Sequence, residues 1–208
     1  MIGYKLLRSD LSSLSDQYGR HKYSAEWTHV PGNGAYVALT LPGLLRGGMG
    51  EVFAQVEYAE LTGAVDDDDV VTARRVRVLR HAPLDLWAFV RAVIWGARQV
   101  LPLEGNPLRA VCLRAVEAAD RCERERTSEA ADAASGAWAD AWVSDAAVGA
   151  ARWSAKASAW AAEASARAAR GREVSAAEAV SLATREAARA GGTDLARRLL
   201  EQLAKEVF

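Results

Sequence analysis

Apolar and polar residues alternate along several stretches of the first 82 residues, a pattern typical of half-buried β-strands. The clearest stretch is residues 51–61, whose apolar face comprises Val52, Ala54, Val56 and Tyr58. Three further strands are predicted, at residues 2–8, 34–40 and 70–80. Glutamates in residues 51–61 would face arginines in residues 70–80 if these two strands pair in antiparallel fashion, so we expect that pairing.

From residue 83 onward the apolar positions recur every three or four residues, which predicts α-helices. Pro83 suits the first position of a helix, and this helix is expected to end near Leu101. A second helix begins after Pro107, and residues 128–170 are predicted to form a third. Two more follow, separated by Gly191 and Gly192, because glycine favours a helix end.

The sequence therefore predicts an α+β fold with two domains. A small antiparallel β-rich domain occupies residues 1–82, and an alanine-rich all-α domain with one long tryptophan-bearing helix occupies residues 83–208. The composition changes at the same point, since all histidines and tyrosines precede it and six of the seven tryptophans follow it. Alanine buries little area, so larger side chains must supply most of the core.

The predicted helix at residues 128–170 carries a stripe of tryptophans. At about 100° per residue, one face within about 60° holds Trp138, Trp142, Trp153 and Trp160. One helix of this length would span about 64 Å, whereas a compact chain of 208 residues has a diameter of about 43 Å. The helix either projects or breaks near Val148, Gly149 and Ala150. A single interior glycine costs only about 1 kcal/mol, so a continuous, bent helix is the favoured prediction.

The two faces of this helix suggest two contacts. Packing against the rest of the chain would explain the tryptophans, but exposed tryptophans also dominate protein interfaces, and neighbouring charges predict that at least two of the four are substantially exposed. The opposite face is rich in alanine and serine, including Ala151, Ser158 and Ala162, and lets another backbone approach closely. A helix longer than the globule would leave part of this face free, so we expect a two-fold homodimer.

Charge and cysteine content restrict the class of protein. The net charge of −1 gives no general attraction to nucleic acid or anionic membranes. No run of about 18 apolar residues predicts a transmembrane helix, and the first residues lack a signal-peptide core. Cys112 and Cys122 would lie about 15 Å apart along a helix, too far for a disulfide. We expect two reduced thiols in a cytoplasmic protein.

No group of residues has the spacing of a metal or phosphate site. The four aspartates at residues 66–69 lack the ligand spacing of a calcium loop. The glycine-rich residues 32–34 and 47–50 do not join a strand to a helix, as phosphate-binding loops do. We expect turns at these places, no metal and no cofactor.

One enzymatic arrangement stays open as an alternative. Arg8 ends the first predicted strand, Thr40 ends the second, and Gln55 and Glu57 lie in the third. This order resembles the Arg…Ser-Thr-Ser…Gln/Glu-x-Glu layout of arginine-type ADP-ribosyltransferases, without the serine pair. The resemblance implies that Arg8 would hold the phosphates of NAD and that Glu57 would stabilise an oxocarbenium-like sugar, in a cleft where the two side chains converge.

Two sets of segments resemble sequences from bacteriophages and actinobacteria. Residues 3–6 (GYKL), 34–37 (GAYV), 53–57 (FAQVE) with Gly63, and 72–78 (TARRVRV) are similar to an uncharacterised domain family of phages and prophages. That family carries Gly-Phe-His-Phe-Cys where this chain has residues 34–38. Residues 95–101 (WGARQVL), 117–121 (EAADR) and the Ala/Trp tract from Glu129 resemble the helical tails of hypothetical actinobacterial and actinophage proteins.

These patterns together favour a non-enzymatic protein-interaction module of the phage or prophage type. The partner is expected to be a protein, including a second copy of this chain, with no nucleic acid and no membrane involved. Binding would occur on helix surfaces, through Trp138, Trp142, Trp153 and Trp160. The alternative hypothesis is a divergent NAD-dependent ADP-ribosyltransferase-like enzyme in the β-rich half.

Overall fold

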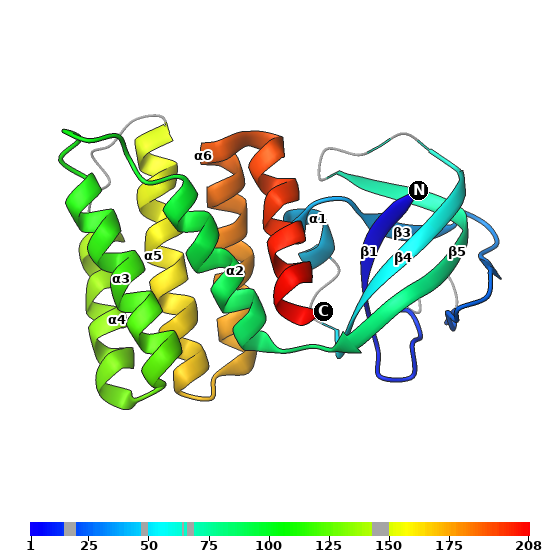
Figure 1. The fold of residues 1–208 in the computed structure, drawn as a ribbon, viewed down its shortest axis with the longest axis horizontal. Helices are drawn as coiled ribbons and strands as arrows, with labels where there is room; N and C mark the ends of the chain where they lie inside the picture. The colour runs from blue at the N-terminus through cyan, green and yellow to red at the C-terminus, as the bar shows by residue number, and fades with distance from the viewer. Residues whose placement is uncertain (15–19, 47–49, 64, 66–68, 143–149) are drawn as a thin grey trace. The chain divides into compact units, whose positions relative to one another are not determined.

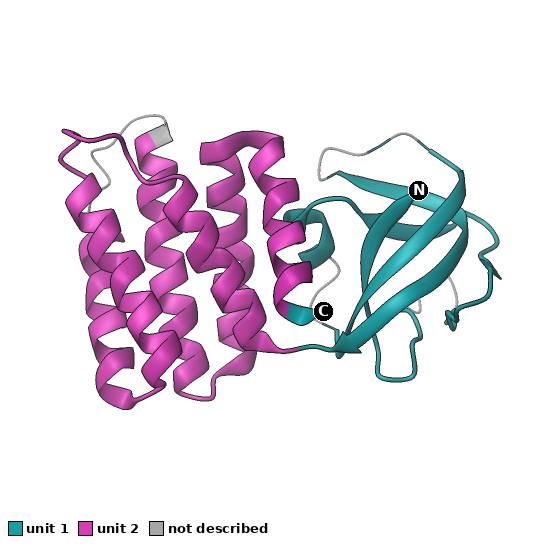
Figure 2. Cartoon of the chain, viewed as in Figure 1, with its two compact units in different colours: residues 1–84, 207–208 teal, residues 85–206 magenta. Residues whose placement is uncertain are grey.

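A computed structural model describes residues 1–14, 20–46, 50–63, 65, 69–142 and 150–208. These residues form two compact units, Met1–Leu84 with Val207–Phe208, and Asp85–Glu206 (Figure 2). The sequence analysis placed a boundary between residues 82 and 83. The fold is α+β as predicted, with antiparallel strands in the first unit and helices filling the second (Figure 1).

The strands of the first unit belong to one antiparallel sheet. They are β1 (Ile2–Leu7), β2 (Thr28–His29), β3 (Ala35–Ala38), β4 (Val52–Leu61) and β5 (Val70–Pro83). The four predicted strands are confirmed to within a few residues. The sequence analysis missed β2, because a strand of two residues has no periodicity to detect.

The sheet closes on itself as a small barrel. β5 pairs with both β3 and β4, and β1 lies between β4 and β3. The joins are unequal in length. β1 and β4 pair along the whole of β1, whereas among the described residues β1 and β3 pair only at Tyr4 and Ala38. The β1–β3 join is therefore the weakest part of the closed sheet.

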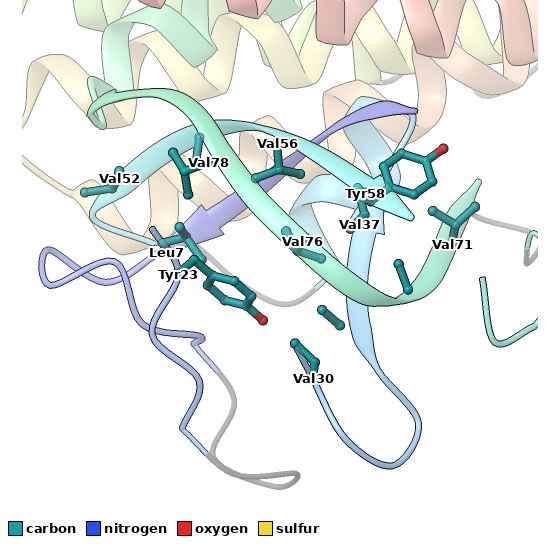
Figure 3. Close-up of a cluster of buried hydrophobic side chains, with 13 residues drawn as sticks. Leu7, Tyr23, Val30, Val37, Val52, Val56, Tyr58, Val71, Val76 and Val78 are labelled. Carbon is teal, nitrogen blue, oxygen red and sulfur yellow. The ribbon is translucent and has the colours of Figure 1, made fainter. Parts of the chain in front are cut away.

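Alternate residues of β4 and β5 fill the barrel (Figure 3). The predicted inner face of β4 is confirmed, since Val52, Ala54, Val56 and Tyr58 are all buried. The expected antiparallel pairing of β4 with β5 is also confirmed. On its outer side Glu57 lies opposite Arg77, with 2.6 Å between a carboxylate oxygen and a guanidinium nitrogen.

Short helix α1 (Leu41–Leu45) lies in the first unit, and the longer helices build the second. These are α2 (Leu86–Gln99), α3 (Arg109–Glu125), α4 (Ser128–Trp142), α5 (Ala150–Ala169) and α6 (Glu173–Val207). α2 begins later than predicted because Pro83 still belongs to β5 and Asp85 caps the helix through the Trp87 N–H. Thr127 caps α4 in the same way, by accepting from the Ala130 N–H.

The predicted separation of the last two helices at Gly191 and Gly192 is confirmed. Within α6, Gly192 has φ 76° and ψ −176°, a left-handed value of φ that favours glycine. The two halves of α6 lie side by side as a hairpin, coloured orange and red in Figure 1.

The prediction of one continuous helix at residues 128–170 is wrong. α4 ends at Trp142 and α5 begins at Ala150, and the two helices lie side by side (Figure 1). The rings of Trp138 and Trp160 have centroids 6.4 Å apart, whereas in one helix these residues would be separated by about 33 Å. The residues between the two helices, including Val148 and Gly149, lie outside the described part of the chain.

The physical reason for the fold-back is the small size of the α5 side chains. Ten alanine and serine residues around this helix are buried: Ser154, Ala155, Ala157, Ser158, Ala159, Ala161, Ala162, Ala164, Ser165 and Ala166. α5 contacts α2, α3 and α4, so the part of it that carries these small residues lies inside the helical unit, while Trp153, Lys156 and Trp160 on the same helix are only partly buried. A projecting helix would leave these close contacts unmade.

The expectation that the Ala/Ser face stays available for a second copy is also wrong. Ser158 and Ala162 are completely buried within the chain, and the thiol of Cys112 in α3 lies within hydrogen-bond reach of Ser158. This face is therefore already occupied by neighbouring helices, and it provides no surface for the predicted homodimer.

Ser158 gives a direct test of this packing. The Ser158→Leu variant should lower the free energy of unfolding by at least about 2 kcal/mol, because added bulk must displace closely packed helices. The Ser158→Ala variant, which removes only a hydroxyl bonded to the Ser154 carbonyl, should change it by less than about 1 kcal/mol. Urea unfolding followed by circular dichroism measures both. Equal stability of the leucine variant and the wild type would contradict a central position for α5.

Candidate functional site

Three tryptophans meet where α4 packs against α5. Trp138 and Trp142 of α4 stack with ring centroids 6.0 Å apart, and Trp160 of α5 contacts Trp142 edge-on at 5.3 Å. Such stacked and edge-on pairs add to the stabilisation from burial alone. The sequence predicts that these residues share one face of a single helix, whereas they come from two helices that pack together.

The fourth tryptophan joins this cluster through a lysine. The Lys156 Nζ lies 5.4 Å from the Trp142 ring centroid and 5.7 Å from that of Trp153. The Arg189 guanidinium of α6 lies 5.0 Å from the Trp153 ring. Cations over aromatic faces are attracted by the negative face of the ring. We call Trp138, Trp142, Trp153, Trp160 and Lys156 the tryptophan surface.

The tryptophans of this surface differ in exposure. Trp142 is 41 % exposed, while the other three are partly buried. Substantial exposure of at least two rings was expected, and Trp142 alone reaches it. The indole N–H of Trp138 is buried without a hydrogen-bond partner in the described part of the chain. The rings thus serve both as packing between helices and as an accessible apolar surface.

The residues of the transferase alternative do not converge. Glu57 lies opposite Ile2, at the beginning of β1, whereas Arg8 follows Leu7 at the end of that strand. At about 3.3 Å per residue, the strand positions are separated by about 20 Å. The expected cleft between Arg8 and Glu57 is not formed by these strand positions.

The side chains of the four residues in the transferase alternative each make a local structural contact; these residues are Arg8, Thr40, Gln55 and Glu57. Arg8 donates to the Leu14 carbonyl, and buried Thr40 caps α1 by accepting from the Gly43 N–H. Gln55 accepts from Arg80 at 2.8 Å, and Glu57 is paired with Arg77. These contacts stabilise strands and a turn, which is the ordinary structural explanation for such residues.

The sequence analysis missed a site in the barrel. A pocket of about 160 Å³ lies beside Lys5, whose side chain is only 9 % exposed. Its ammonium donates to the Tyr36 carbonyl and lies 5.1 Å from the ring of Tyr23. A signal was present, because Lys5 is in phase with the buried Leu7, and period-two alternation places both side chains on one face.

Burial gives Lys5 unusual chemistry. It lowers the pKa of the Lys5 ammonium from 10.5 to about 8, because the charged form is poorly solvated inside the barrel. The same cause raises the pKa of Tyr23 to about 12. Titratable groups shifted by burial and gathered at a pocket are features of functional sites.

The described ranges hold neither a metal-binding cluster nor a helix that could cross a membrane. These residues contain no cluster of three or more histidine, cysteine or acidic side chains suited to a metal ion. Asp66, Asp67 and Asp68 of the predicted acidic turn lie outside those ranges. None of the described helices has the length and apolar character needed to cross a bilayer.

Comparison with known proteins gives no neighbour for this arrangement. No protein-family model, curated protein or solved structure matches the chain.

The buried ammonium predicts an unusual dependence of stability on pH. Since its pKa is lower in the folded chain, the unfolded chain binds more protons between about pH 8 and pH 10.5, and stability rises over that range. Below pH 8 the buried ammonium lowers the free energy of unfolding by up to about 3 kcal/mol. The Lys5→Met variant should therefore be more stable than the wild type at pH 7, with a difference that narrows towards pH 9.5.

Urea unfolding at pH 7.0, 8.5 and 9.5 measures this difference, and the range stops below the titration of Tyr23. The matched control is Lys22→Met, which removes a lysine that is not buried. This control should keep the pH dependence of the wild type. A Lys5→Met variant with that same dependence would show that Lys5 does not cause it.

Proposed function

We propose that the chain is a non-enzymatic protein-interaction module that binds an acidic protein segment on its tryptophan surface. The observation that carries the proposal is the combination of the exposed Trp142 ring with Lys156, which lies over two indoles. Aromatic anchors supply most of the binding energy in protein interfaces. A surface that offers both an anchor and a cation suits a partner with an apolar side chain and a carboxylate.

The charge of the partner follows from the contacts of Lys156. In the described part of the chain its ammonium contacts aromatic rings, and no ion pair with a carboxylate is formed there. Arg189, beside Trp153, is already paired with Glu186 at 3.0 Å. A carboxylate of the partner would therefore pair with Lys156, and its approach would be guided by charge complementarity.

The proposal includes the biological setting that the sequence resemblance implies. The module is of the phage or prophage type and acts in assembly or binding in the host cytoplasm, where the free thiols of Cys112 and Cys122 stay reduced. The partner is a different protein. Self-association of the chain through the same surface is the other outcome that the experiment below distinguishes.

Photo-crosslinking in the native host tests the proposal. A photoreactive phenylalanine replaces Trp142 in one variant and Val174 in a control, because Val174 is an apolar side chain that is 88 % exposed at the start of α6. We expect one dominant adduct from position 142, located by mass spectrometry in an acidic segment, and none from position 174. An adduct of twice the chain mass would instead identify a second copy.

A charge reversal completes this experiment with the partner segment that it identifies. The Lys156→Glu variant should bind the synthetic segment at least tenfold more weakly, which corresponds to about 1.4 kcal/mol. Binding should recover when the segment's acidic residues are replaced by lysine. Equal binding by the wild type and the variant would contradict the role of Lys156, and identical adducts from positions 142 and 174 would contradict the tryptophan surface.

The enzymatic alternative has its own test. We expect the purified protein to show no NAD hydrolysis and no transfer of ADP-ribose to arginine, because Arg8 and Glu57 lie at opposite ends of the β1–β4 pair. Chromatography of NAD and its products measures this. Turnover that disappears in Glu57→Gln but persists in Glu60→Gln, a control on the same strand, would establish the transferase instead.

A further inference from the structure

The pocket beside Lys5 lies at the weakest join of the barrel. Apart from the pair of Tyr4 with Ala38, no backbone pairing joins β1 to β3 in the described residues. Lys5 from β1 and Ala35 and Tyr36 from β3 line the pocket where this pairing is missing. The Lys5 side chain connects the two strands by donating to the Tyr36 carbonyl. The pocket is therefore built into the sheet and does not depend on a surface loop alone.

The described residues of this pocket do not balance the charge of Lys5. Among the described lining residues, Lys5 is the only lysine, arginine, aspartate or glutamate. Its partners there are the Tyr36 carbonyl and the Tyr23 ring, which carry only partial negative charge. A buried ammonium without a counter-ion is unfavourable. An anion in the pocket would supply the missing charge.

The size and walls of the pocket restrict the anion. Its volume of about 160 Å³ is close to the cavity of about 150 Å³ that holds a benzene molecule. The wall includes the ring of Tyr23, which lies beside the Lys5 ammonium, and the leucines Leu14 and Leu44. Such walls favour a flat or apolar body over a hydrated ion. One ring bearing one acidic group has the matching size and charge.

We propose that the barrel pocket binds a small aromatic or cyclic carboxylate, whose carboxylate pairs with the Lys5 ammonium and whose ring lies against the tyrosine and leucine walls. This site is independent of the tryptophan surface, because it lies wholly within the Met1–Leu84 unit. Lys5 is its specificity-determining residue. The tyrosine rings bind the apolar body of the ligand, and no reaction is required.

Benzoate is the probe for this site. Isothermal titration calorimetry and NMR of ¹³C-labelled lysine measure its binding to the full chain at pH 7. We expect saturable binding with a shift of the Lys5 signal, at least tenfold weaker binding in Lys5→Met, and unchanged binding in Lys22→Met. Inorganic phosphate, benzyl alcohol and benzylamine should each bind at least tenfold more weakly than benzoate, because each lacks either the ring or the negative charge.

The pH dependence gives a second readout. Affinity for benzoate should fall about tenfold per pH unit above the pKa of the ammonium, because the neutral amine no longer pairs with the carboxylate. The titratable residues that line the pocket with Lys5 are Tyr4, Tyr23, Tyr36 and His21. Dependence that persists in Lys5→Met would come from them and would contradict the pairing.

Several results would overturn the proposal. The proposed ion pair would be contradicted if the wild type and Lys5→Met bound benzoate with equal affinity, or if the wild type bound benzoate and benzyl alcohol with equal affinity. Equal affinity of the wild type for phosphate and benzoate would contradict the proposed contact of the pocket with the ligand's ring. The Lys5→Met variant is expected to be folded and more stable than the wild type at pH 7, and its unfolding curve confirms that any lost binding is not lost folding.

Discussion

Close packing of alanine and serine around α5 is the constraint on which the helical unit depends. The alanine and serine residues of α5 gain little from burial of area, since each methyl removes little surface from water. The stability of this helix comes from many short contacts with α2, α3 and α4, and these exist only if the neighbouring backbones come close. Bulky residues on α5 are therefore confined to positions that do not separate the helices, and Trp153 and Trp160, both only partly buried, occupy such positions. Close packing of small side chains inside the helical unit thus leaves the large tryptophan rings at the edge of that unit, beside Lys156.

The barrel depends on a different balance. Its interior is filled by branched and aromatic side chains that remove large areas from water (Figure 3). Lys5 departs from this pattern, because its side chain is buried at the short β1–β3 join. On the outer surface, charged side chains form ion pairs, such as that between Glu57 and Arg77 on neighbouring strands. Surface pairs of this kind contribute little to stability. A buried charge that no described carboxylate balances lowers the free energy of unfolding much more.

The strands were predictable from the sequence, because period-two alternation is a local signal that a half-buried strand must carry. Val52 and Val56 are examples, and both are buried as predicted. Helix existence was predictable for the same reason, and so was the interruption at Gly192. The break between α4 and α5 was not predictable, because a face rich in alanine and serine is compatible both with a projecting helix and with a central one. Local propensity favours continuity there by about 1 kcal/mol, and this small preference is overridden by tertiary contacts that no single-sequence pattern reports. For Lys5 the local pattern was sufficient, because its alternation with Leu7 places both side chains on the buried face of the strand. Its burial was missed because a lysine in a strand is usually exposed.

Register also decides which chemistry the β-rich unit can perform. Residues that follow one another along a family motif form a site only if the strands bring them to the same end of a sheet. In this barrel β1 and β4 are antiparallel, so a residue after the end of β1 lies near the start of β4, where Val52 pairs with Leu7. Glu57 is five residues further along β4, so it lies far from Arg8. Residues that follow the order of the family motif, Arg8, Thr40, Gln55 and Glu57, therefore do not meet at one site. The residues that do converge, Lys5 with Tyr23 and Tyr36, come from segments with no motif in common. A pocket assembled in this way offers one buried ammonium beside a tyrosine ring, and the ligand that we propose for it is therefore defined by charge and shape.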